Sequence, residues 1–512
     1  MSFSSEVVVF ILYLVFMLGV GVFFFIRQKR ASEKTFFLGD RKMGAWVTAL
    51  SAGASDMSAW VLMGLPTSIY AAGMGQMWCP IGLLLGYALS WFLVAPRLRK
   101  FSIVANDSIT IPQYLTNRFL SGSKILQIVC AAVFLIAYTV YAATSVKACG
   151  ILFNKVIGWD TQTAMLIGAL IIVGYTFLGG FSAVCWTDFF QGLLILGAML
   201  IAPIFAVTTM EASSAGTLQN SGDFWNMFSD WRSIVSGLAW GFGYFGMPHI
   251  IIRFMSLKSQ KELKKSRVIG ISWTALILLF AAVIGIVGKL YLRGDEAYLE
   301  GVVANELVFI EMVREIFKNA HIIVGVLLAA VLAASMSTAD SQLLAASSSF
   351  AADVYQPVFR KNKASGKEML WIGRCVVLVV AVVAFFMARS PKAGSIMDMV
   401  GNAWGLFGAA FGPVILLSLM WKRFNFAGAV AGIVGGAAAD ILWLTFLLET
   451  FTEKNEAGQI ISRICVYDTG VYELFPGFIV GLLAAVIVTL CTKAPGKDVE
   501  ALFDRAVAYE DE

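Results

Sequence analysis

The segment Ser51-Ala-Gly-Ala-Ser-Asp-Met-Ser-Ala-Trp60 lies inside an apolar run that extends from about residue 44 to about residue 73. A helix that spans a membrane has little reason to carry a carboxylate, three serines and a glycine within ten residues. Broken helical backbone persists at membrane depth only where it is buried in protein or lines a watery cavity. An ionisable residue at that depth is by default a functional residue. Asp56 therefore predicts that the chain moves or senses something polar inside the bilayer.

The composition restricts the class of protein. The chain has 512 residues, of which 59% are hydrophobic and 14% are charged, and this predicts an all-α polytopic membrane protein. The formal charge of +5 does not indicate nucleic-acid binding, because the basic residues lie in short loops between apolar runs. The seven cysteines form no CxxC pair, and the two histidines are too few for a histidine-rich metal site. No Walker A motif and no nucleophile–base constellation is present, so neither ATP drive nor an enzyme is expected.

Apolar runs predict thirteen membrane spans. The loops at 27–42, 97–124, 258–267 and 360–367 are rich in Lys and Arg, whereas those at 211–230, 295–315 and 449–468 lean acidic. This alternation places the N-terminus outside and the C-terminus in the cytoplasm. No basic n-region precedes the first span and no small-residue cleavage site follows it, so an uncleaved first span is expected. A short amphipathic helix is expected at 305–317. The spans are expected at 6–27, 44–72, 74–96, 125–154, 161–183, 189–209, 233–256, 267–292, 322–350, 370–389, 395–420, 425–448 and 471–492.

A second break indicates internal symmetry. The run Trp240-Gly-Phe-Gly-Tyr-Phe-Gly-Met-Pro-His249 interrupts span 7, five spans after the break in span 2. Five is odd, so equivalent helices would run in opposite directions, and paired broken helices are the best sequence indicator of a transporter's binding site. The predicted organisation is a first helix and basic loop at 1–43, a five-helix repeat at 44–209, an inverted five-helix repeat at 233–420, two helices at 425–492 and a cytoplasmic tail at 493–512.

The breaks also predict an ion site. Unwound backbone leaves carbonyl oxygens without helical partners, and carbonyl and hydroxyl oxygens suit a small alkali cation. Ser337 and Thr338 are adjacent in the middle of span 9 and are candidate ligands, although such residues often bond back to their own helix. Asp56 has three possible roles: it could bind the cation, carry a proton or accept bonds from backbone amides at the break.

Other side chains indicate a solute site and a route inward. Trp240, Tyr244, Tyr141 and Ser58 could line an apolar pocket beside a half-helix N-terminus, which would suit a zwitterionic amino acid. The alternative is that these aromatic rings simply pack in the core. Asp188, at the start of span 6, is either an acid near a helix N-terminus or part of the inward route. Asp340, with Ser337 and Ser341, could complete a second cation site.

At these residues the chain resembles the sodium:solute symporter family, and within it the bacterial sodium/proline symporters. The resemblance runs nearly end to end and rests on five motifs: Leu38-Gly-Asp-Arg41, Ala49-Leu-Ser-Ala-Gly-Ala-Ser-Asp-Met-Ser58, Trp186-Thr-Asp188, Gly243-Tyr-Phe-Gly246 followed by Pro248-His249, and Met336-Ser-Thr338. It implies a LeuT-type 5+5 inverted repeat with discontinuous helices 2 and 7. It also implies sodium-coupled uptake of L-proline across the cell membrane by alternating access.

The resemblance further implies roles for individual residues. Arg41 would influence coupling from the inner side, and Asp188 would lie on the sodium exit path. Ser55 and Asp56 would support sodium affinity. The sodium ligands would be the carbonyls of Ala54, Met57 and Ala334 and the hydroxyls of Ser337 and Thr338. The solute would lie near Ser58, Tyr141, Trp240, Tyr244, Met247 and Pro248.

Two positions depart from the sodium/proline pattern. Met247 stands where Gln is usual, and Ala59 stands where Gly is usual. Both border the expected solute pocket, and Met lacks the donor and acceptor of an amide. Another amino acid, betaine or a carboxylate therefore remains an alternative solute. A sensor or channel is a weaker alternative, because no signalling domain is apparent. No oligomeric state is implied.

Overall fold

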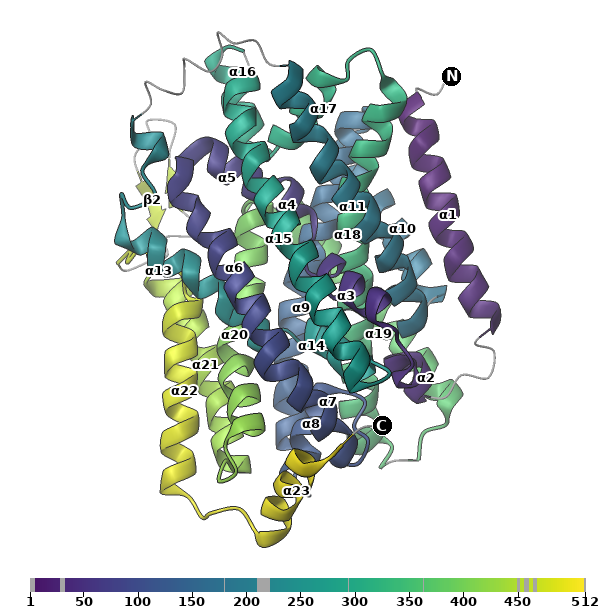
Figure 1. Cartoon of the computed structure of the whole chain (residues 1–512), viewed down its shortest axis with the longest axis vertical. Coiled ribbons are helices and arrows are strands. Elements are labelled where there is room, and N and C mark those ends of the chain that lie inside the picture. The colour runs from purple at the N-terminus through teal and green to yellow at the C-terminus, as the bar shows by residue number, and fades with distance from the viewer. Residues whose placement is uncertain are drawn as a thin grey trace.

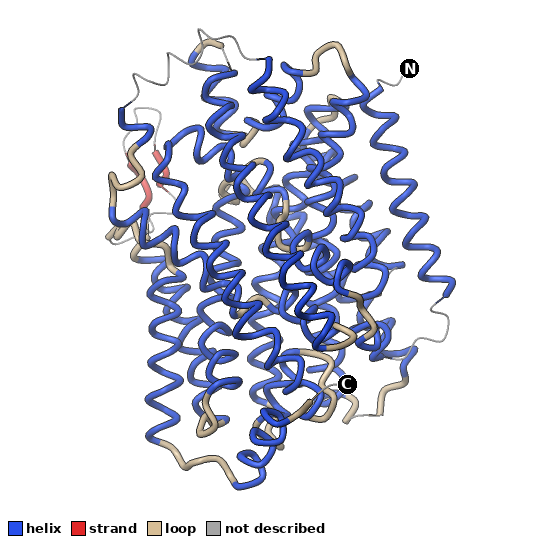
Figure 2. Tube along the Cα trace, in the orientation of Figure 1, coloured by secondary structure: helices blue, strands red, loops and turns tan. Residues whose placement is uncertain are grey.

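The computed structural model is a bundle of helices standing side by side (Figure 1). It describes residues 5–27, 33–178, 180–209, 222–292, 294–361, 363–448, 452–454, 460–463 and 467–510. Helix dominates these residues, apart from two short antiparallel strands at one flank, β1 (Thr452–Lys454) and β2 (Ile460–Arg463) (Figure 2). The helices are α1 Ser5–Arg27, α2 Glu33–Leu38, α3 Ala45–Ala54, α4 Ala59–Leu62, α5 Gly64–Ala72, α6 Trp78–Leu89, α7 Ala95–Val104, α8 Ile111–Arg118, α9 Ile125–Ile157, α10 Thr161–Leu178, α11 Phe181–Thr209, α13 Trp231–Ala239, α14 Pro248–Ser256, α15 Gln260–Tyr291, α16 Glu296–Ala304, α17 Val308–Ile316, α18 His321–Ser348, α19 Gly366–Arg389, α20 Ile396–Met420, α21 Phe426–Phe446, α22 Leu474–Cys491 and α23 Lys497–Ala508.

The described part of the chain contains ten helices that are long and apolar enough to cross a membrane. The prediction of a helical, multi-pass membrane protein is confirmed, whereas the number thirteen stays a prediction. Two of the expected spans are interrupted. Span 2 divides into α3, α4 and α5, and span 7 divides into α13, the 3₁₀ segment η5 (Trp240–Phe245) and α14. Lys29, Arg30, Glu211 and Glu449, which contributed to the predicted loop charges, lie outside the described residues.

Glycines bring α6 against the second break. A Cβ atom on Gly86 would lie 2.1 Å from the carbonyl oxygen of Gly241, and one on Gly82 would lie 2.2 Å from that of Gly237. Real Cβ atoms do not approach backbone so closely, so only glycine permits this contact. Small residues at such contacts are how helices in membranes approach one another. The sequence of α6 thus fixes where η5 lies.

In the acidic loop expected at 295–315, a buried glutamate anchors α20. The expected helix at 305–317 is present as α17, but it is preceded by a second helix, α16, that was not predicted. Between them, Glu306 accepts bonds from the backbone N–H groups of Ile396 (2.8 Å) and Met397 (3.0 Å). Helix N-termini carry unsatisfied N–H groups and a partial positive charge, so this carboxylate stabilises the start of α20.

The C-terminal segment, expected to be a tail, forms α23 and folds back under the bundle (Figure 1). Phe503 packs edge-on against Phe101 of α7, with 5.2 Å between ring centroids. The guanidinium of Arg118, at the end of α8, lies 4.9 Å from the centroid of the same Phe503 ring. The apolar face of a short amphipathic helix therefore covers the ends of two helices.

Candidate functional site

The first break lies between α3 and α4. Helix α3 ends at Ala54, and the N–H groups of Asp56 and Met57 both bond back to the carbonyl of Gly53 (3.1 and 2.9 Å). A new helix then begins, with Ser58 as its N-cap. Because a helix C-terminus presents carbonyls with partial negative charge, the end of α3 is suited to a cation.

Three of the expected ion ligands meet at this break. The hydroxyl of Ser337, in the middle of α18, donates to the carbonyl of Ala54 at 2.8 Å and lies 3.1 Å from the carbonyl of Ala334. The hydroxyl oxygen of Thr338, the next residue, is fully buried and has no hydrogen-bond partner among the described residues. Buried polar atoms are normally partnered, so an unpartnered hydroxyl next to Ser337 in the chain fits a cation ligand set. Met57 is also fully buried.

The carboxylate of Asp56 connects the two breaks. Tyr244, in η5, donates its hydroxyl to Asp56 Oδ2, and both side chains are fully buried. The other oxygen, Oδ1, has no hydrogen-bond partner in the part of the chain that the structure describes. Of the three possible roles of Asp56, bonding to backbone amides at the break is not what the structure shows, because the recorded donor is a tyrosine side chain. The neighbouring Ser55 bonds locally, to the carbonyl of Ala52 at 3.3 Å.

Stacked aromatic rings lie beside the breaks. The ring of Trp240 stacks on Trp60 (6.2 Å between centroids), on Trp404 (6.4 Å) and on Tyr472 (4.9 Å). Trp404 also donates its indole N–H to the carbonyl of Trp240 at 2.8 Å. These rings form an aromatic wall at Trp240, and three of them were not singled out from the sequence.

The remaining expected solute-site residues lie around the start of α14. Met247 is its N-cap and Pro248 its first residue, where a missing N–H costs nothing. On α9, the ring of Tyr141 lies edge-on to His249, with 6.2 Å between centroids. Ala59, which begins α4, is buried. These residues therefore surround the two breaks.

On one side of the breaks, a buried ion pair joins α11 to α14. Arg253 donates to Asp188 Oδ2 at 2.8 Å, and neither side chain is more than 2% exposed. Arg253 also donates to Ser51 (2.7 Å) and Ser341 (2.7 Å). Ser341 in turn lies 3.3 Å from Asp340 Oδ1. The guanidinium of Arg253 therefore lies where the sequence predicted a second cation. Beside it is a cavity of about 10 Å³, which has room for one water molecule.

Arg41 belongs to a different cluster, at the end of the bundle near α2, α7 and α8. It donates to the carbonyls of Met255 (2.6 Å) and Ser108 (2.8 Å), and its Nε lies 2.9 Å from Asp107 Oδ1. Lys34 contacts the other oxygen of Asp107. Partial burial acts to raise the pKa of Asp107, but the contacts with Lys34 and Arg41 outweigh it and hold that pKa below its ordinary value. Arg41 thus ties the end of α14 to the α7–α8 loop.

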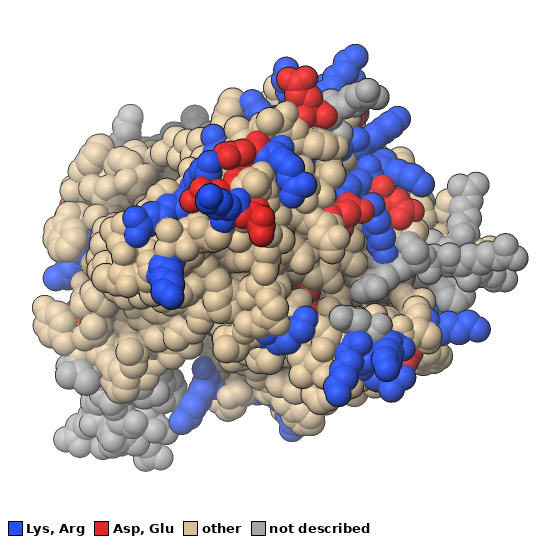
Figure 3. Space-filling view, turned by 90° about the horizontal axis from the view of Figure 1, so that it is seen from below, with Lys and Arg blue, Asp and Glu red and all other residues tan. Residues whose placement is uncertain are grey.

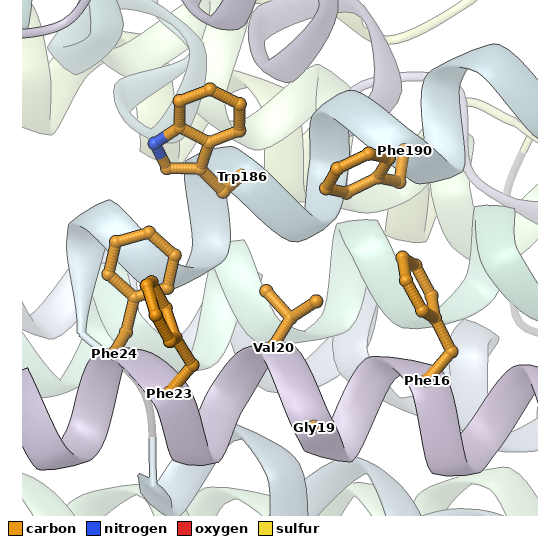
Figure 4. Close-up of a pocket in the computed structure, with 7 residues that line it drawn as sticks. All are labelled: Phe16, Gly19, Val20, Phe23, Phe24, Trp186 and Phe190. Atoms are coloured by element: carbon orange, nitrogen blue, oxygen red, sulfur yellow. The ribbon is translucent and has the colours of Figure 1, made fainter.

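A groove of about 590 Å³ lies between α1 and α11, away from both breaks. Phe16 and Phe23 project from α1 toward Trp186 and Phe190 of α11, with no charged side chain among the lining residues (Figure 4). These rings are exposed on the flank of a bundle that lies in a membrane, where lipid tails are the expected neighbours. The groove has no polar side-chain group except the indole N–H of Trp186, and it is not the candidate site.

Comparisons with known proteins identify the family. A model of the Sodium:solute symporter family matches residues 36–436. The chain belongs to this family. A sodium/proline symporter of Staphylococcus aureus (strain USA300 / TCH1516) is 40% identical to this chain over 496 residues, which cover 95% of this chain and 93% of the relative. The resemblance read from the motifs is therefore confirmed, and it supports sodium-coupled symport of a small solute.

Two solved structures share the fold of the symporter. A Na⁺-coupled sialic acid symporter, in a substrate-bound outward-open state, has a TM-score of 0.75 at 21% identity and covers 96% of this chain and 99% of that chain. A nucleobase-cation-symport-1 family transporter, in a closed conformation with bromovinylhydantoin bound, has a TM-score of 0.54 at 14% identity and covers 92% and 97%. At these identities the likeness supports the architecture and says nothing about the solute.

Sequence reasoning missed Arg253 in the symporter. The signal was present, because Arg253 follows His249 by four residues within the apolar run Ile250-Ile-Ile-Arg-Phe-Met255. A cation inside an apolar span calls for a named partner, and Asp188 is that partner. Trp60, Trp404 and Tyr472 were also missed, but single tryptophans and tyrosines in apolar runs give no comparable signal.

Proposed function

We propose that this symporter takes up L-proline together with sodium by alternating access. The observation that carries the proposal is the contact of Ser337 with the free carbonyl of Ala54, which brings α18 against the end of a broken helix. Sodium would replace the hydroxyl hydrogen as the partner of these oxygens. The proposed ligands are the carbonyls of Ala54, Met57 and Ala334 and the hydroxyls of Ser337 and Thr338, with Ser55 and Asp56 in support.

The solute is proposed to lie between the breaks, near Ser58, Tyr141, Trp240, Tyr244, Met247 and Pro248. The aromatic wall supports an apolar body, and the N-terminus of the half-helix α14 supports a carboxylate. The named relative is a proline symporter, which favours L-proline. Met247 and Ala59 border this space, so another amino acid, betaine or a carboxylate is the second candidate class.

The proposed mechanism needs the two breaks to respond together. Sodium binding between α3 and α18 would stabilise one state and raise solute affinity, and this coupling must be reciprocal. The bond between Tyr244 and Asp56 supports such coupling, since it joins the ion-side break to the solute-side break. The inverted 5+5 repeat of 44–209 and 233–420 remains part of this proposal.

The orientation is proposed from surface charge. Lys and Arg side chains gather on the end of the molecule that carries α2, α7, α8 and α23 (Figure 3). The positive-inside rule places that end in the cytoplasm, with the C-terminus there and the N-terminus outside. On this reading Arg41 and the Asp188–Arg253 pair lie on the inner side of the breaks.

One experiment tests the function directly. Proteoliposomes that contain the purified protein should accumulate labelled L-proline when an inward sodium gradient is imposed, and not when sodium is replaced by potassium. Unlabelled proline should compete better than betaine, other amino acids or carboxylates. If unlabelled proline does not compete, the solute belongs to the second candidate class. If uptake proceeds without sodium, sodium is not the coupling ion. Currents far above solute flux would indicate a channel.

Tyr244→Phe tests the link between the breaks. Losing a hydrogen bond to a carboxylate costs about 1.5–3 kcal/mol, so we expect the sodium concentration for half-maximal uptake to rise by about ten- to a hundredfold. Tyr114→Phe is the matched control, because it also removes a buried tyrosine hydroxyl bond, to Ser418 at 3.0 Å, but far from both breaks. Equal effects of the two variants on sodium dependence would contradict a specific role for Tyr244.

Asp340→Ala tests the second cation site proposed at Asp188, Asp340 and Ser341. If a second sodium binds there, the variant should lower the Hill coefficient for sodium and weaken sodium affinity. If sodium affinity and cooperativity stay as in the wild type, the second site is refuted and the guanidinium of Arg253 is the cation of this cluster.

Asp107→Asn tests the inner cluster around Arg41. Because the folded pKa of Asp107 is lowered, its contacts stabilise the fold above the ordinary carboxyl pKa of about 4 and are lost as the pH falls through the lower folded value. The variant should therefore lower the melting temperature at about pH 7, and the difference should shrink in acid. Asp504→Asn, which removes the exposed pair with Lys422, should change little at either pH. A difference that did not vary with pH would contradict this role of Asp107.

A further inference from the structure

Two buried carboxylates face each other outside the proposed sodium and solute sites. Asp440 lies on α21 and Glu473 caps the start of α22, and each side chain is 1% exposed. A Cβ atom on Gly405 of α20 would lie 2.9 Å from Asp440 Oδ1 and 3.2 Å from Glu473 Oε1. The two oxygens therefore converge on the space that the glycine leaves open.

Neither of these oxygens has a hydrogen-bond partner. Asp440 Oδ1 and Glu473 Oε1 are both completely buried and unpartnered within the part of the chain that the structure describes. Buried polar atoms are normally satisfied, so two such atoms aimed at one point indicate a missing ligand between them. The ligand must be small, because Gly405 and Gly477 hold the surrounding helices close: a Cβ on Gly477 would lie 3.1 Å from the Cβ of Asp440.

The charged surroundings indicate that the ligand is positive. The carboxylates act on each other, and the further charge acting on Glu473 is also acidic, Asp398 of α20. Tyr472 is the neutral ionisable neighbour of both carboxylates, and Cys79 and Tyr141 are its own ionisable neighbours. On the adjoining helices, Arg232 of α13 is exposed and packs against Gly470, and Lys147 of α9 contacts the carbonyl of Gly394. Two bare negative charges this close inside a protein repel strongly.

We propose that Asp440 and Glu473 form a proton-binding site in which one exchangeable proton is shared between the two carboxyl groups. The proton, taken from solvent, turns one carboxylate into a donor to the other and leaves a single negative charge. A metal ion fits less well, since it needs a shell of several oxygens and no cluster of three or more His, Cys, Asp or Glu side chains that could hold a metal is found among the described residues.

The site lies directly behind the aromatic wall. Tyr472, next to Glu473, stacks on Trp240 at 4.9 Å and donates to the carbonyl of Gly401 at 2.6 Å. Loss of the proton would add a negative charge behind this stack and displace it. A consequence, which rests on the proposed function, is that solute affinity varies with pH through the pair. The proton site itself does not depend on what the protein transports.

The test measures protein stability without any solute. The melting temperature of the full-length protein in detergent micelles is followed from about pH 6 to about pH 9. The wild type should lose stability as the pH rises, because the shared proton is lost and a second buried charge appears. Glu473→Gln and Asp440→Asn should each flatten this slope, since one amide and one carboxylate need no shared proton. Asp504→Asn, which removes an exposed acid paired with Lys422 and away from this site, should keep the wild-type slope.

A second pair of variants keeps both acids. Gly405→Ala would place a methyl carbon 2.9 Å from Asp440 Oδ1 and force the pair apart, so its slope should be reduced. Gly401→Ala, one turn away and no closer than 3.5 Å to any neighbour, should retain the slope. Wild-type slopes in Glu473→Gln and Gly405→Ala would overturn the proposal. A second result would also overturn it: at constant ionic strength, Na⁺ or K⁺ raises the melting temperature of the wild type but not of Glu473→Gln. The ligand between the carboxylates would then be a metal cation.

Discussion

Replacing Ser337 with alanine is expected to raise the sodium concentration for half-maximal uptake by about ten- to a hundredfold. The hydroxyl is placed between the carbonyls of Ala54 and Ala334, so its loss removes one oxygen from the proposed ion site and one contact between α3 and α18. An interaction of about 1.5–3 kcal/mol with a charged partner corresponds to that change in affinity. Thr338→Ala should act in the same direction, because its buried hydroxyl has no hydrogen-bond partner to lose among the described residues.

Ser335→Ala provides the matched control for both variants. Ser335 is fully buried on the same helix, but it donates to the carbonyl of Val331 in its own helix at 2.9 Å. Removing that hydroxyl changes helix polarity and packing in the same way without touching the break. Sodium-dependent uptake should therefore stay close to wild type. Normal sodium dependence in Ser337→Ala, or an equal defect in Ser335→Ala, would refute the ion-site assignment.

Breaking the buried pair of Asp188 and Arg253 is expected to have the largest effect on stability. Either Arg253→Met or Asp188→Asn leaves its partner without a counter-charge in a site that is at most 2% exposed. Removing one member of a buried ion pair typically costs about 3–5 kcal/mol. Each single variant should melt at a clearly lower temperature and transport poorly.

The double variant Asp188→Asn/Arg253→Met separates stability from transport. Replacing both charges by neutral groups is often close to neutral for stability, so the melting temperature should recover most of the loss. Uptake should remain impaired if the pair also takes part in sodium release. Recovery of uptake together with stability would show that the pair is purely structural. Lys422 and Asp504, an exposed pair, should show no comparable coupling in a matched cycle.

The breaks in spans 2 and 7 were predictable because polar and small residues inside an apolar run are costly unless the backbone changes there. The contact of Ser337 with α3 followed from the same reasoning, since an unwound carbonyl needs a partner and α18 carries adjacent hydroxyls in mid-span. The family motifs then directed attention to these residues. The expected ion site therefore rested on the local sequence of spans 2 and 9 together with the family resemblance.

Other features of the site depend on which distant helices come into contact. The pattern of apolar residues does not encode those contacts. Asp56 is bonded by Tyr244, 188 residues away, rather than by the adjacent backbone. Asp188 forms an ion pair with the side chain of Arg253, whereas the sequence placed it on the route of a sodium ion. The expected tail contains the helix α23 (Lys497–Ala508) because Val499, Leu502, Phe503 and Ala506 share one buried face. Such a short pattern cannot be distinguished from a polar tail by composition.

Helix α23 has a mechanical consequence. Phe503 rests on Phe101 of α7 and under Arg118 at the end of α8, and these two helices continue into different parts of the bundle. Any rotation of α6 and α7 against α8 and α9 has to slide these rings across one another. Helix α23 should therefore resist relative motion of α7 and α8 at this end of the molecule. A fluorophore attached near Ala508 would register that sliding from outside the membrane, and a bulky fusion placed there would slow it.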